Sequence, residues 1–409
     1  MYDILKGMRV VEGASFIAAP SCCLHLLQMG AEVIRFDMIG GGPDFRRWPL
    51  ARDGASLYWE GLNKGKKSIA IDLSRPQGRE LAVAITTAPG KQGGLFVTNY
   101  PADGFLSHEH LKARREDMIT LRVMGWADGR NAVDYTVNAV AGLPLMTGPT
   151  VLAPDEPVNH VLPAWDLLTG SYAAFALLAA ERRRRETGQG AELRVPLSDV
   201  AAATLGNLGQ IAEVATSGQD RPRMGNDLFG AFGRDFETAD GQRLIIVAIT
   251  TRQWTGLVEA LGIGPNVRSL ETELAVSFAD EGERFTHRAR LFPVVQSAIG
   301  RRRLDELAPR FDGKGVCWSV YRSLSQSMAS ERGFVRDNPI FSPMTHASGE
   351  SYPTPGAAAT FVDTPRRDPA PAPGLGQHTD EVLAEVLSLS AAQIGHLHDQ
   401  GLVAGPGGD

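Results

Sequence analysis

The sequence predicts an α/β protein whose first half forms a parallel sheet with helices on both faces. Short runs rich in Val, Ile and Phe alternate with helical patterns from the amino terminus to about Val123. The connections between these segments are short, and such strand–helix–strand repetition is typical of parallel sheets. Beyond Val123 the alternation loosens, which indicates a second region of different architecture. Ligands of parallel sheets bind beyond the carboxyl ends of the strands.

Alternating and continuous apolar runs locate the elements of the first half. The expected strands are residues 8–12, 32–37, 67–73, 94–99 and 118–123. The expected helices between them are residues 20–29, 77–86 and 107–115, the last capped by Ser107. The turn after the first strand reads EGASFIAAPS and lacks the G-x-G-x-x-G spacing of a dinucleotide site. A nicotinamide-dependent dehydrogenase is therefore disfavoured.

The remaining segments predict a small second domain and a return to the first. Further expected elements are a helix at 134–142, a Pro-rich loop at 143–163, a long helix from Asp166 to about 185, a strand at 192–197, a helix at 199–216, a hairpin turning at Ala239–Gly241, helices at 253–261 and 292–307, a strand at 316–321 and a closing helix near the carboxyl end. The expected division is 1–216 for the large domain, 217–227 for a linker, 228–324 for a small α+β domain, and 325–409 for the return to the large domain.

Charge and cysteine content exclude several classes of protein. There are 41 basic and 47 acidic residues, a net charge of −6, and no basic stripe for a nucleic-acid backbone. The three cysteines, Cys22, Cys23 and Cys317, have neither metal-ligand spacing nor a disulfide framework. No secretion signal or membrane-length apolar run is evident. We expect a soluble, cytoplasmic protein with no metal site, no membrane contact and no nucleic-acid partner.

Asp166 stands where an irregular segment becomes a long apolar helix. Taken alone, this position favours a structural role, because Asp is a preferred N-cap whose side chain accepts the unpaired N–H groups of the first turn. The alternative is a reactive carboxylate at the start of the helix.

The order of motifs resembles the class III coenzyme A transferases, a family that also contains α-methylacyl-CoA racemases. The similar segments are LKGMRVVEGASFIAAPSCCLHLLQMGAEVIRFD, NKGKKSIAIDL, LFVTNYPADGF, VNHVLPAWDLLTG, GAFGRDFETADG and LGQHTDEVLAEVLSLS. The resemblance implies a Rossmann-like large domain built from both chain ends, a small domain between them, and an interlocked homodimer. It also implies a CoA thioester as the small-molecule partner, with CoA as part of the substrate and no other cofactor.

In the family's transferases, the aspartate matching Asp166 attacks the thioester carbonyl and forms a mixed anhydride. A carboxylate suits this task because its acyl adduct is itself a reactive acyl donor. Attack requires the anion, and we expect the positive end of the helix to favour ionisation. An N-cap and a nucleophile are compatible, although a side chain fully engaged in capping attacks less well.

Two departures from the family's racemases favour CoA transfer. Val133 stands where racemases carry a proton-exchanging histidine, and Thr250 and Thr251 stand where they carry a glutamate. The glycine-rich loop of oxalate-using transferases is also absent. The resemblance thus favours an enzyme that moves CoA between the two carboxyls of one branched unsaturated diacid. The alternatives are an intermolecular transferase, a racemase, and a non-catalytic CoA-thioester-binding subunit in which Asp166 is only a cap.

Candidate binding residues follow from this chemistry. Arg46 and Arg47 have the forked guanidinium geometry that suits the free carboxylate of a diacid. Further candidates near the acyl group are Tyr135, Asn138, His160 and Trp165. The resemblance implies that CoA lies along Phe16, Ile17, Arg35, Lys64, Lys66, Lys67, Asn99 and Tyr100.

Overall fold

A computed structural model describes residues 1–407 and confirms a mixed α/β fold. Contacts divide the chain into two compact units. The first comprises Met1–Ala141, Val161–Gly218 and the segment from Asp337 onward, so both chain ends build it. The second comprises Gly142–His160 and Gln219–Arg336. Segment 142–160 thus groups with the second unit, whereas the sequence left it in the large domain. The domain boundaries placed at 217–227 and at 325 remain predictions.

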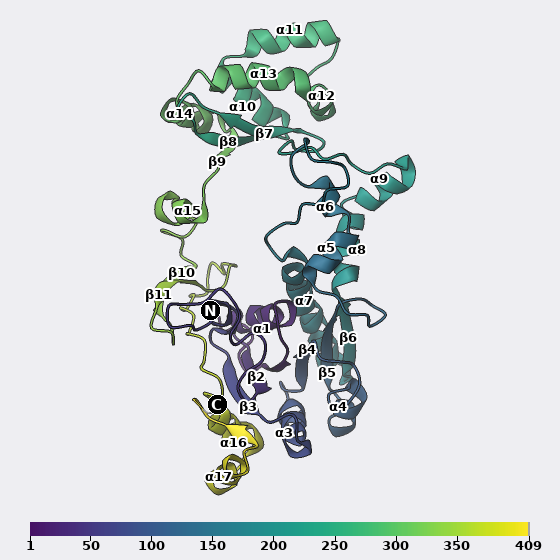
Figure 1. Cartoon of the computed structure of the whole chain (residues 1–409), viewed down its shortest axis with the longest axis vertical. Coiled ribbons are helices and arrows are strands. Elements are labelled where there is room, and N and C mark those ends of the chain that lie inside the picture. Colours follow the sequence, from purple (N-terminus) through teal and green to yellow (C-terminus); the bar gives the residue numbers. More distant parts are fainter. Residues whose placement is uncertain (408–409) are drawn as a thin grey trace. The chain divides into compact units, whose positions relative to one another are not determined.

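The first unit is organised around a seven-stranded sheet (Figure 1). Its strand order is β12-β3-β2-β1-β4-β5-β6, and every pairing is parallel except that of β12 with β3. The strands are β1 (Arg9–Gly13), β2 (Glu32–Met38), β3 (Lys67–Ile71), β4 (Leu95–Thr98), β5 (Ile119–Met124), β6 (Ala191–Pro196) and β12 (Val403–Ala404). The apolar runs therefore located the strands of the first half to within one or two residues.

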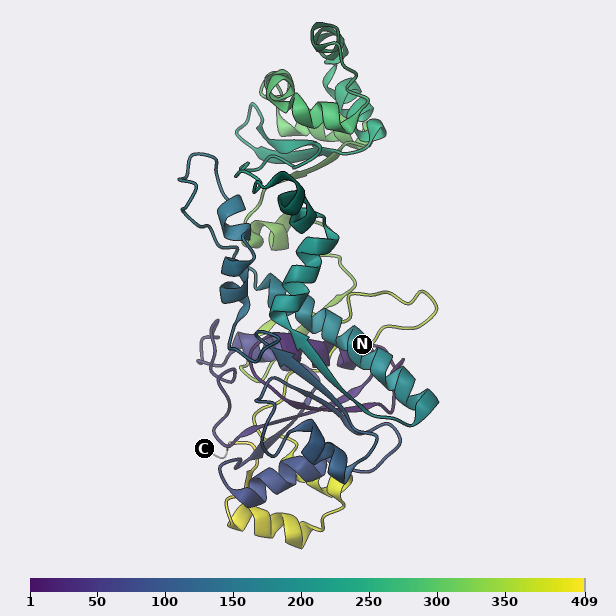
Figure 2. The same ribbon diagram turned by 90° about the vertical axis from the view of Figure 1, so that its right-hand side faces the viewer.

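Helices cover both faces of this sheet, as Figure 2 shows. Helices α1 and α7 pack together on one face, while α3, α4 and the carboxy-terminal α16 lie on the other. The helices of this unit are α1 (Ala18–Gln28), α2 (Leu57–Asn63), α3 (Pro76–Thr87), α4 (His108–Arg114), α5 (Asp134–Val140), α7 (Ala164–Thr187), α8 (Leu197–Asn207), α9 (Gln210–Ser217), α16 (Thr379–Leu387) and α17 (Ala391–Asp399). The same unit contains the hairpin of β10 (Phe341–Thr345) and β11 (Ser351–Pro355).

Local chemistry explains where several helices begin and end. The Ser107 hydroxyl accepts a hydrogen bond from the His110 N–H at 3.3 Å, which confirms the predicted cap of α4. The single helix expected at 199–216 is wrong, because Gly209 adopts a φ of 76° and separates α8 from α9.

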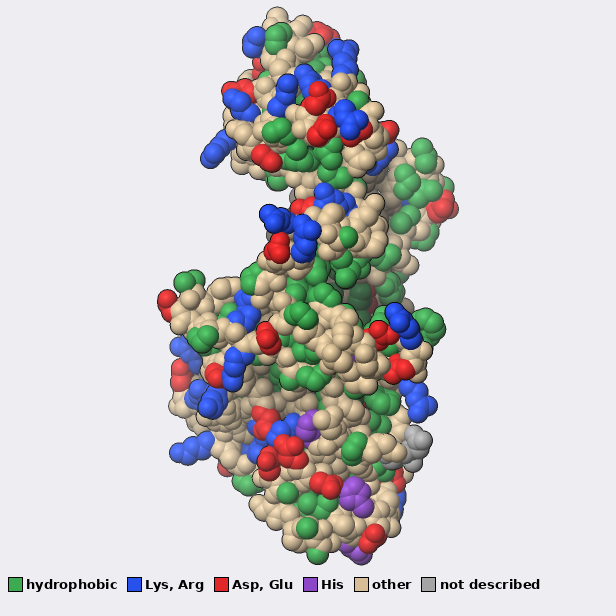
Figure 3. All heavy atoms as spheres, turned by 90° about the vertical axis from the view of Figure 1, so that its left-hand side faces the viewer, with side chains coloured by type: hydrophobic (Ala, Val, Ile, Leu, Met, Phe, Trp, Pro, Cys, Tyr) green, Lys and Arg blue, Asp and Glu red, His purple; other side chains and the backbone are tan. Residues whose placement is uncertain are grey.

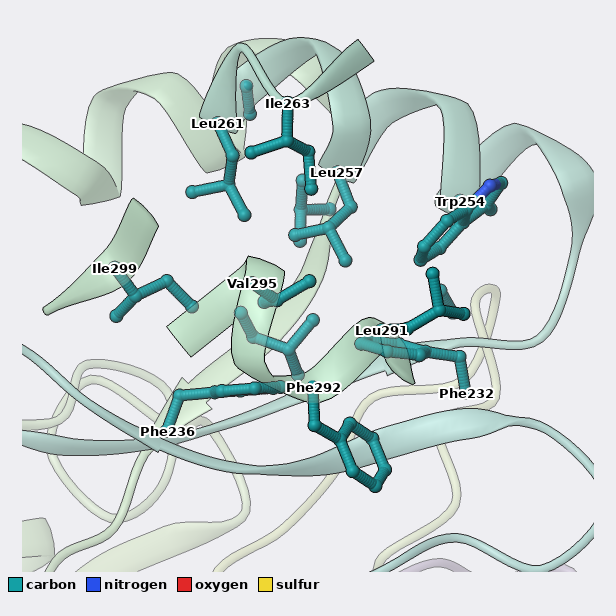
Figure 4. Close-up of a cluster of buried hydrophobic side chains, with 14 of the residues drawn as sticks. Phe232, Phe236, Trp254, Leu257, Leu261, Ile263, Leu291, Phe292, Val295 and Ile299 are labelled. Carbon is teal, nitrogen blue, oxygen red and sulfur yellow. The ribbon is translucent and has the colours of Figure 1, made fainter. Parts of the chain in front are cut away.

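The second unit is a three-stranded antiparallel sheet, β7-β8-β9, packed against helices. Figure 4 shows part of its core, where Phe232 and Phe236 of β7 meet Trp254, Leu257 and Phe292. Its elements are α6 (Leu143–Met146), β7 (Phe232–Glu237), β8 (Arg243–Ala248), α10 (Thr251–Leu261), α11 (Gly264–Leu274), α12 (Glu281–Thr286), α13 (Arg288–Ile299), α14 (Leu304–Lys314), β9 (Cys317–Val320) and α15 (Leu324–Ser330).

The hairpin predicted at Ala239–Gly241 joins β7 to β8, with Gly241 at a φ of 73°. The helix expected at 292–307 is wrong, because α13 ends before Gly300 and α14 begins only at Leu304.

Figure 3 shows lysine and arginine side chains interspersed with acidic ones over the face in view. Within residues 1–407, no helix has both the length and the apolar character needed to span a membrane.

Candidate active site

The start of helix α7 is capped by another carboxylate, not by Asp166. The N-cap position is Pro163, and Asp166 is the third residue of the helix. Asp134, the first residue of α5, accepts hydrogen bonds through Oδ2 from the Trp165 N–H at 2.7 Å and the Asp166 N–H at 3.0 Å. The expectation that Asp166 caps the helix is therefore wrong. Asp134 satisfies these first-turn donors, which leaves the Asp166 carboxyl available for chemistry.

Asp166 lines a cavity of about 910 Å³ that lies entirely within the first unit. The cavity opens beyond the carboxyl ends of β1, β4 and β5, where parallel sheets bind their ligands. Arg47, Trp48 and Tyr58 form part of its wall, and residues 129–135 form another part.

Burial and a neighbouring carboxylate oppose ionisation of Asp166. Burial, together with the neighbouring Asp134 carboxylate, raises the pKa of Asp166 to about 7, while the Arg47 guanidinium acts to lower it. From the sequence alone, the positive end of the helix is expected to favour the anion. In the folded chain, burial and a like charge outweigh that influence, so the carboxyl is divided between its acid and anion near neutral pH.

Of the two adjacent arginines, only Arg47 belongs to the cavity. Its guanidinium carbon lies 5.4 Å from the ring centroid of Phe16 and 5.3 Å from that of Tyr58. Within the described chain, Arg47 has no carboxylate partner at ion-pair distance. Arg46 is exposed and does not line the cavity. The geometry thus distinguishes two residues that the sequence could not separate.

Tyr58 is a cavity residue that the sequence analysis missed. Its hydroxyl oxygen is buried, and residues 1–407 supply it with no hydrogen-bond partner. Burial comes first among the effects that raise the pKa of Tyr58, and the carboxylates of Asp44 and Asp166 act in the same direction. No sequence signal marked Tyr58, because its position depends on α2, a seven-residue helix that the analysis did not predict.

The other residues proposed near the acyl group fall into different places. Tyr135 lines the cavity, and its hydroxyl donates to the Val161 carbonyl at 3.2 Å. Trp165 and Asn138 are buried outside the lining and are joined by a hydrogen bond of 3.1 Å from the indole N–H. His160 is not among the residues that line this cavity, and its place near the acyl group stays a prediction.

Four of the residues proposed for CoA line the same cavity: Phe16, Ile17, Asn99 and Tyr100. The Asn99 amide fixes the loop after β1, accepting from the Ser15 N–H at 3.1 Å and donating to the Ser15 carbonyl at 2.8 Å. Phe16 has a φ of 69°, unusual for a residue with a side chain. Its N–H donates to Asp44 Oδ1 at 2.8 Å, which holds this conformation.

Arg35 and Lys66 instead form a buried ion cluster beneath the sheet edge. Arg35 donates twice to Asp37 at 2.8 Å, once to Glu12 at 3.0 Å and once to Asp44 at 3.2 Å. Lys66 donates to Glu12 at 2.7 Å and to the Asn63 side chain at 3.0 Å. Both cations are almost fully buried and have protein partners.

Lys67 and Lys64 also lie outside the Asp166 cavity. Lys67 pairs with Glu32 at 2.8 Å, Glu381 at 2.7 Å and Glu385 at 3.1 Å. Lys64 lines a different, smaller cavity. The predicted contacts of Arg35, Lys64, Lys66 and Lys67 with CoA stay untested, and the geometry gives each of them a position outside the Asp166 cavity.

The fold and the cavity define a class of enzyme. In this class, an α/β domain built from both chain ends presents an aspartate beyond its strands, and that aspartate is not used to cap a helix. The chain belongs to CoA-transferase family III, whose model matches residues 5–379. This confirms the family resemblance seen in the sequence.

Individual proteins of known name are similar to the chain over nearly its whole length. The chain is 49% identical to 2-methylfumaryl-CoA isomerase of Chloroflexus aurantiacus, over 99% of each chain. It is 28% identical to succinyl-CoA–D-citramalate CoA-transferase of the same organism, over 94% of each. In fold it is similar to the crystal structure of a CaiB/BaiF family protein from Brucella suis, with a TM-score of 0.76 and 23% identity, covering 94% of this chain and 100% of that one.

Proposed function

We propose that this enzyme is an intramolecular CoA transferase that moves CoA between the C1 and C4 carboxyls of mesaconate, which is 2-methylfumarate. The observation that carries the proposal is the Asp166 carboxyl in its cavity, freed from capping by Asp134. The full-length similarity to a 2-methylfumaryl-CoA isomerase supports this choice of substrate.

The chemistry begins when the Asp166 carboxylate attacks the thioester carbonyl. The C–S bond breaks, and the products are a mixed anhydride and the CoA thiolate. The thiolate then attacks the Asp166 carbonyl of the anhydride, which releases the diacid and leaves an aspartyl-CoA thioester. The other carboxylate of the retained diacid attacks this thioester, and the same two steps run in reverse. Each bond that breaks is replaced, so no water or second acid is consumed.

Transfer within one substrate requires that the diacid stay bound between the two half-reactions. Retention raises the effective concentration of the accepting carboxylate, by up to roughly 10⁵–10⁸ M in favourable intramolecular cases. We propose that Arg47 and Tyr58 hold the carboxylate that is not reacting. The two carboxyls of the diacid are the ends of a four-carbon chain, so the group that holds one of them must lie near Asp166, which reacts with the other. Arg47 is close enough to Asp166 to lower its pKa. The buried Tyr58 hydroxyl supplies a hydrogen-bond donor beside Arg47.

Chromatographic separation of the two mesaconyl-CoA isomers tests the function. Purified enzyme is incubated with one isomer and no free acid, and we expect the other isomer to accumulate until equilibrium is reached. A strict requirement for an added carboxylic acid would show an intermolecular transferase instead. Exchange of solvent deuterium into the α-position of a 2-methylacyl-CoA would show a racemase.

The carboxylate clamp is tested by Arg47→Met and Tyr58→Phe. Losing a hydrogen bond to a charged group reduces kcat/KM for the diacid thioester by roughly 10–100-fold. An acyl-CoA of similar length without a second carboxylate should form its Asp166 adduct equally well with wild type and both variants. Tyr321→Phe is the matched control, because Tyr321 is an exposed tyrosine that does not line the cavity. If Tyr58→Phe reduced the reaction of both thioesters equally, Tyr58 would act on Asp166 and not on the free carboxylate of the diacid.

We also propose that the enzyme acts as a homodimer. Helix α7 carries an exposed apolar stripe of Leu168, Tyr172 and Phe175, spaced so that all three share one side of the helix. Sedimentation equilibrium should give twice the chain mass at micromolar concentration. A single species of 43.9 kDa at every concentration would contradict the proposal.

A further inference from the structure

A second cavity, of about 150 Å³, lies in the first unit between α2 and the β10–β11 hairpin. It shares no lining residue with the Asp166 cavity. Its polar wall consists of Glu60 and Lys64 from the α2 region and of His346, Tyr352 and Thr354 from the hairpin region.

Lys64 is a buried cation without an anionic partner. It is 4% exposed, and no acceptor for its ammonium group lies at hydrogen-bond or ion-pair distance among residues 1–407. Burial and the like charge of Lys66 lower the pKa of Lys64 to about 8. The Lys66 charge is itself balanced by Glu12. Because a buried charge without a counterion is strongly destabilising, this position favours binding of an anion.

Glu60 does not supply that counterion. One of its oxygens accepts from the Tyr352 hydroxyl at 2.6 Å, and the other accepts from the Ser348 N–H at 3.2 Å. Burial and the neighbouring Lys66 account for the lowered pKa of Lys64. The Glu60 carboxylate therefore joins the helix to the hairpin, and its charge in the same wall disfavours an occupant with more than one negative charge.

His346 provides a second polar atom that the described chain leaves unsatisfied. Its ring stacks on Tyr352 with centroids 4.2 Å apart, and its Nε2 lies 2.8 Å from the Thr354 hydroxyl oxygen. The buried Nδ1 has no hydrogen-bond partner in residues 1–407, the closest carboxylate oxygen being that of Glu60 at 3.9 Å. The Thr354 hydroxyl has two acceptors within reach, the His346 Nε2 at 2.8 Å and the Tyr352 carbonyl at 3.3 Å. Donation to the nearer acceptor, Nε2, places the ring hydrogen on Nδ1, which then becomes a donor.

We propose that this cavity is a binding site for a small monoanion, of halide or formate size, held by the Lys64 ammonium group and the His346 Nδ1–H. The volume accommodates such an ion with water, since a water molecule takes about 30 Å³, and it excludes a nucleotide. The bound ion joins α2 to the hairpin of the returning segment. Because α2 also carries Tyr58, occupancy steadies one wall of the Asp166 cavity.

Thermal unfolding of the full-length protein tests the site. The protein is exchanged into potassium gluconate, whose anion is too large for the cavity, and titrated at constant ionic strength with potassium bromide or potassium formate. Binding to the folded state raises Tm by roughly 2–4 °C in a saturable way. Comparing the two salts distinguishes a halide from a carboxylate as the preferred occupant.

The informative variant is Lys64→Met, with Lys112→Met as the matched control on the exposed side of α4. Lys64→Met should abolish the anion-dependent rise and should raise the starting Tm in gluconate, because it removes an unbalanced buried charge. A lysine with a purely structural role would instead lower that Tm when replaced. The Lys112→Met protein should behave like the wild type.

Crystals of the wild-type protein grown in bromide supply a measurement that needs no variant. We expect an anomalous peak within hydrogen-bond distance of the Lys64 ammonium group. Ordered water alone at that position, or identical titrations for wild type and Lys64→Met, would overturn the proposal.

Discussion

Two clusters of charge lie at the same edge of the sheet and differ in how their charges are balanced. In the buried cluster, Arg35 and Lys66 contact three carboxylates, and every cation has an anionic partner at 3.2 Å or less. In the cavity, the Asp166 carboxyl lies near the like charge of Asp134 and the exposed Arg47. The first arrangement stabilises the fold. The second leaves charge unbalanced, which is what a site for a charged substrate requires.

The largest effect is expected from Asp166→Ala, which removes the reactive group of the cavity. Loss of a nucleophile reduces kcat by roughly 10⁴-fold or more.

The same substitution should increase the stability of the folded protein at neutral pH. The folded pKa of about 7 lies above the ordinary value of 3.8, so the wild type loses stability as pH rises through this interval. The variant should therefore gain stability relative to wild type between pH 5 and pH 8, as measured by urea unfolding.

The opposite pattern is expected from Arg35→Met in the buried cluster. Its removal leaves the carboxylates of Asp37, Asp44 and Glu12 without their shared partner, which costs about 3–5 kcal/mol of unfolding free energy. Arg114→Met is the matched control, because the Arg114–Glu80 pair is exposed and contributes less than about 1 kcal/mol. Equal stability of the two variants would mean that the buried cluster does not support the fold.

A smaller effect separates the two functions of Asp134. Asp134→Asn keeps an oxygen that can cap α7 but removes the like charge, so stability changes little and the pKa of Asp166 falls. The rise of kcat/KM with pH, which reports groups of the free enzyme, should then have its midpoint at a lower pH than in the wild type. Asp134→Ala also loses the cap and about 1 kcal/mol of stability. An unchanged pH midpoint in Asp134→Asn would exclude charge coupling between the two carboxyls.

The smallest effect is expected from Lys67→Met. Its three glutamate partners are partly or largely exposed, so the change in unfolding free energy should stay within about 1 kcal/mol. If Lys67 only joins β3 to β2 and α16, KM for the CoA thioester stays at the wild-type value. A several-fold rise in KM would instead support the CoA contact predicted from the sequence.

The strands of the first half were predictable because each is a short apolar run whose side chains are buried. Helix α2 and the β10–β11 hairpin were not, since both depend on contacts between distant segments. The Tyr352 hydroxyl, for example, donates to Glu60 across nearly 300 residues of sequence.

The candidate site shows the same limit. Asp166, Arg47 and the loop residues Phe16 and Asn99 were identified from motifs and chemistry, and the structure places all four at one cavity. The sequence assigned Arg47 to the free carboxylate of the diacid and Arg35 to CoA, but it could not show which of the two the fold pairs with carboxylates of the chain. What separates them is the set of carboxylates that the fold brings to each one.

Identification of the group that becomes covalently modified tests the central claim most directly. The enzyme is incubated with mesaconyl-CoA in isotope-labelled water, digested, and examined by mass spectrometry for label in the peptide that contains Asp166. Slow hydrolysis of the aspartyl-CoA thioester should place solvent oxygen in the Asp166 carboxyl only when the thioester is present. Turnover with no label in Asp166, or with label in another carboxylate of the cavity, would contradict the account.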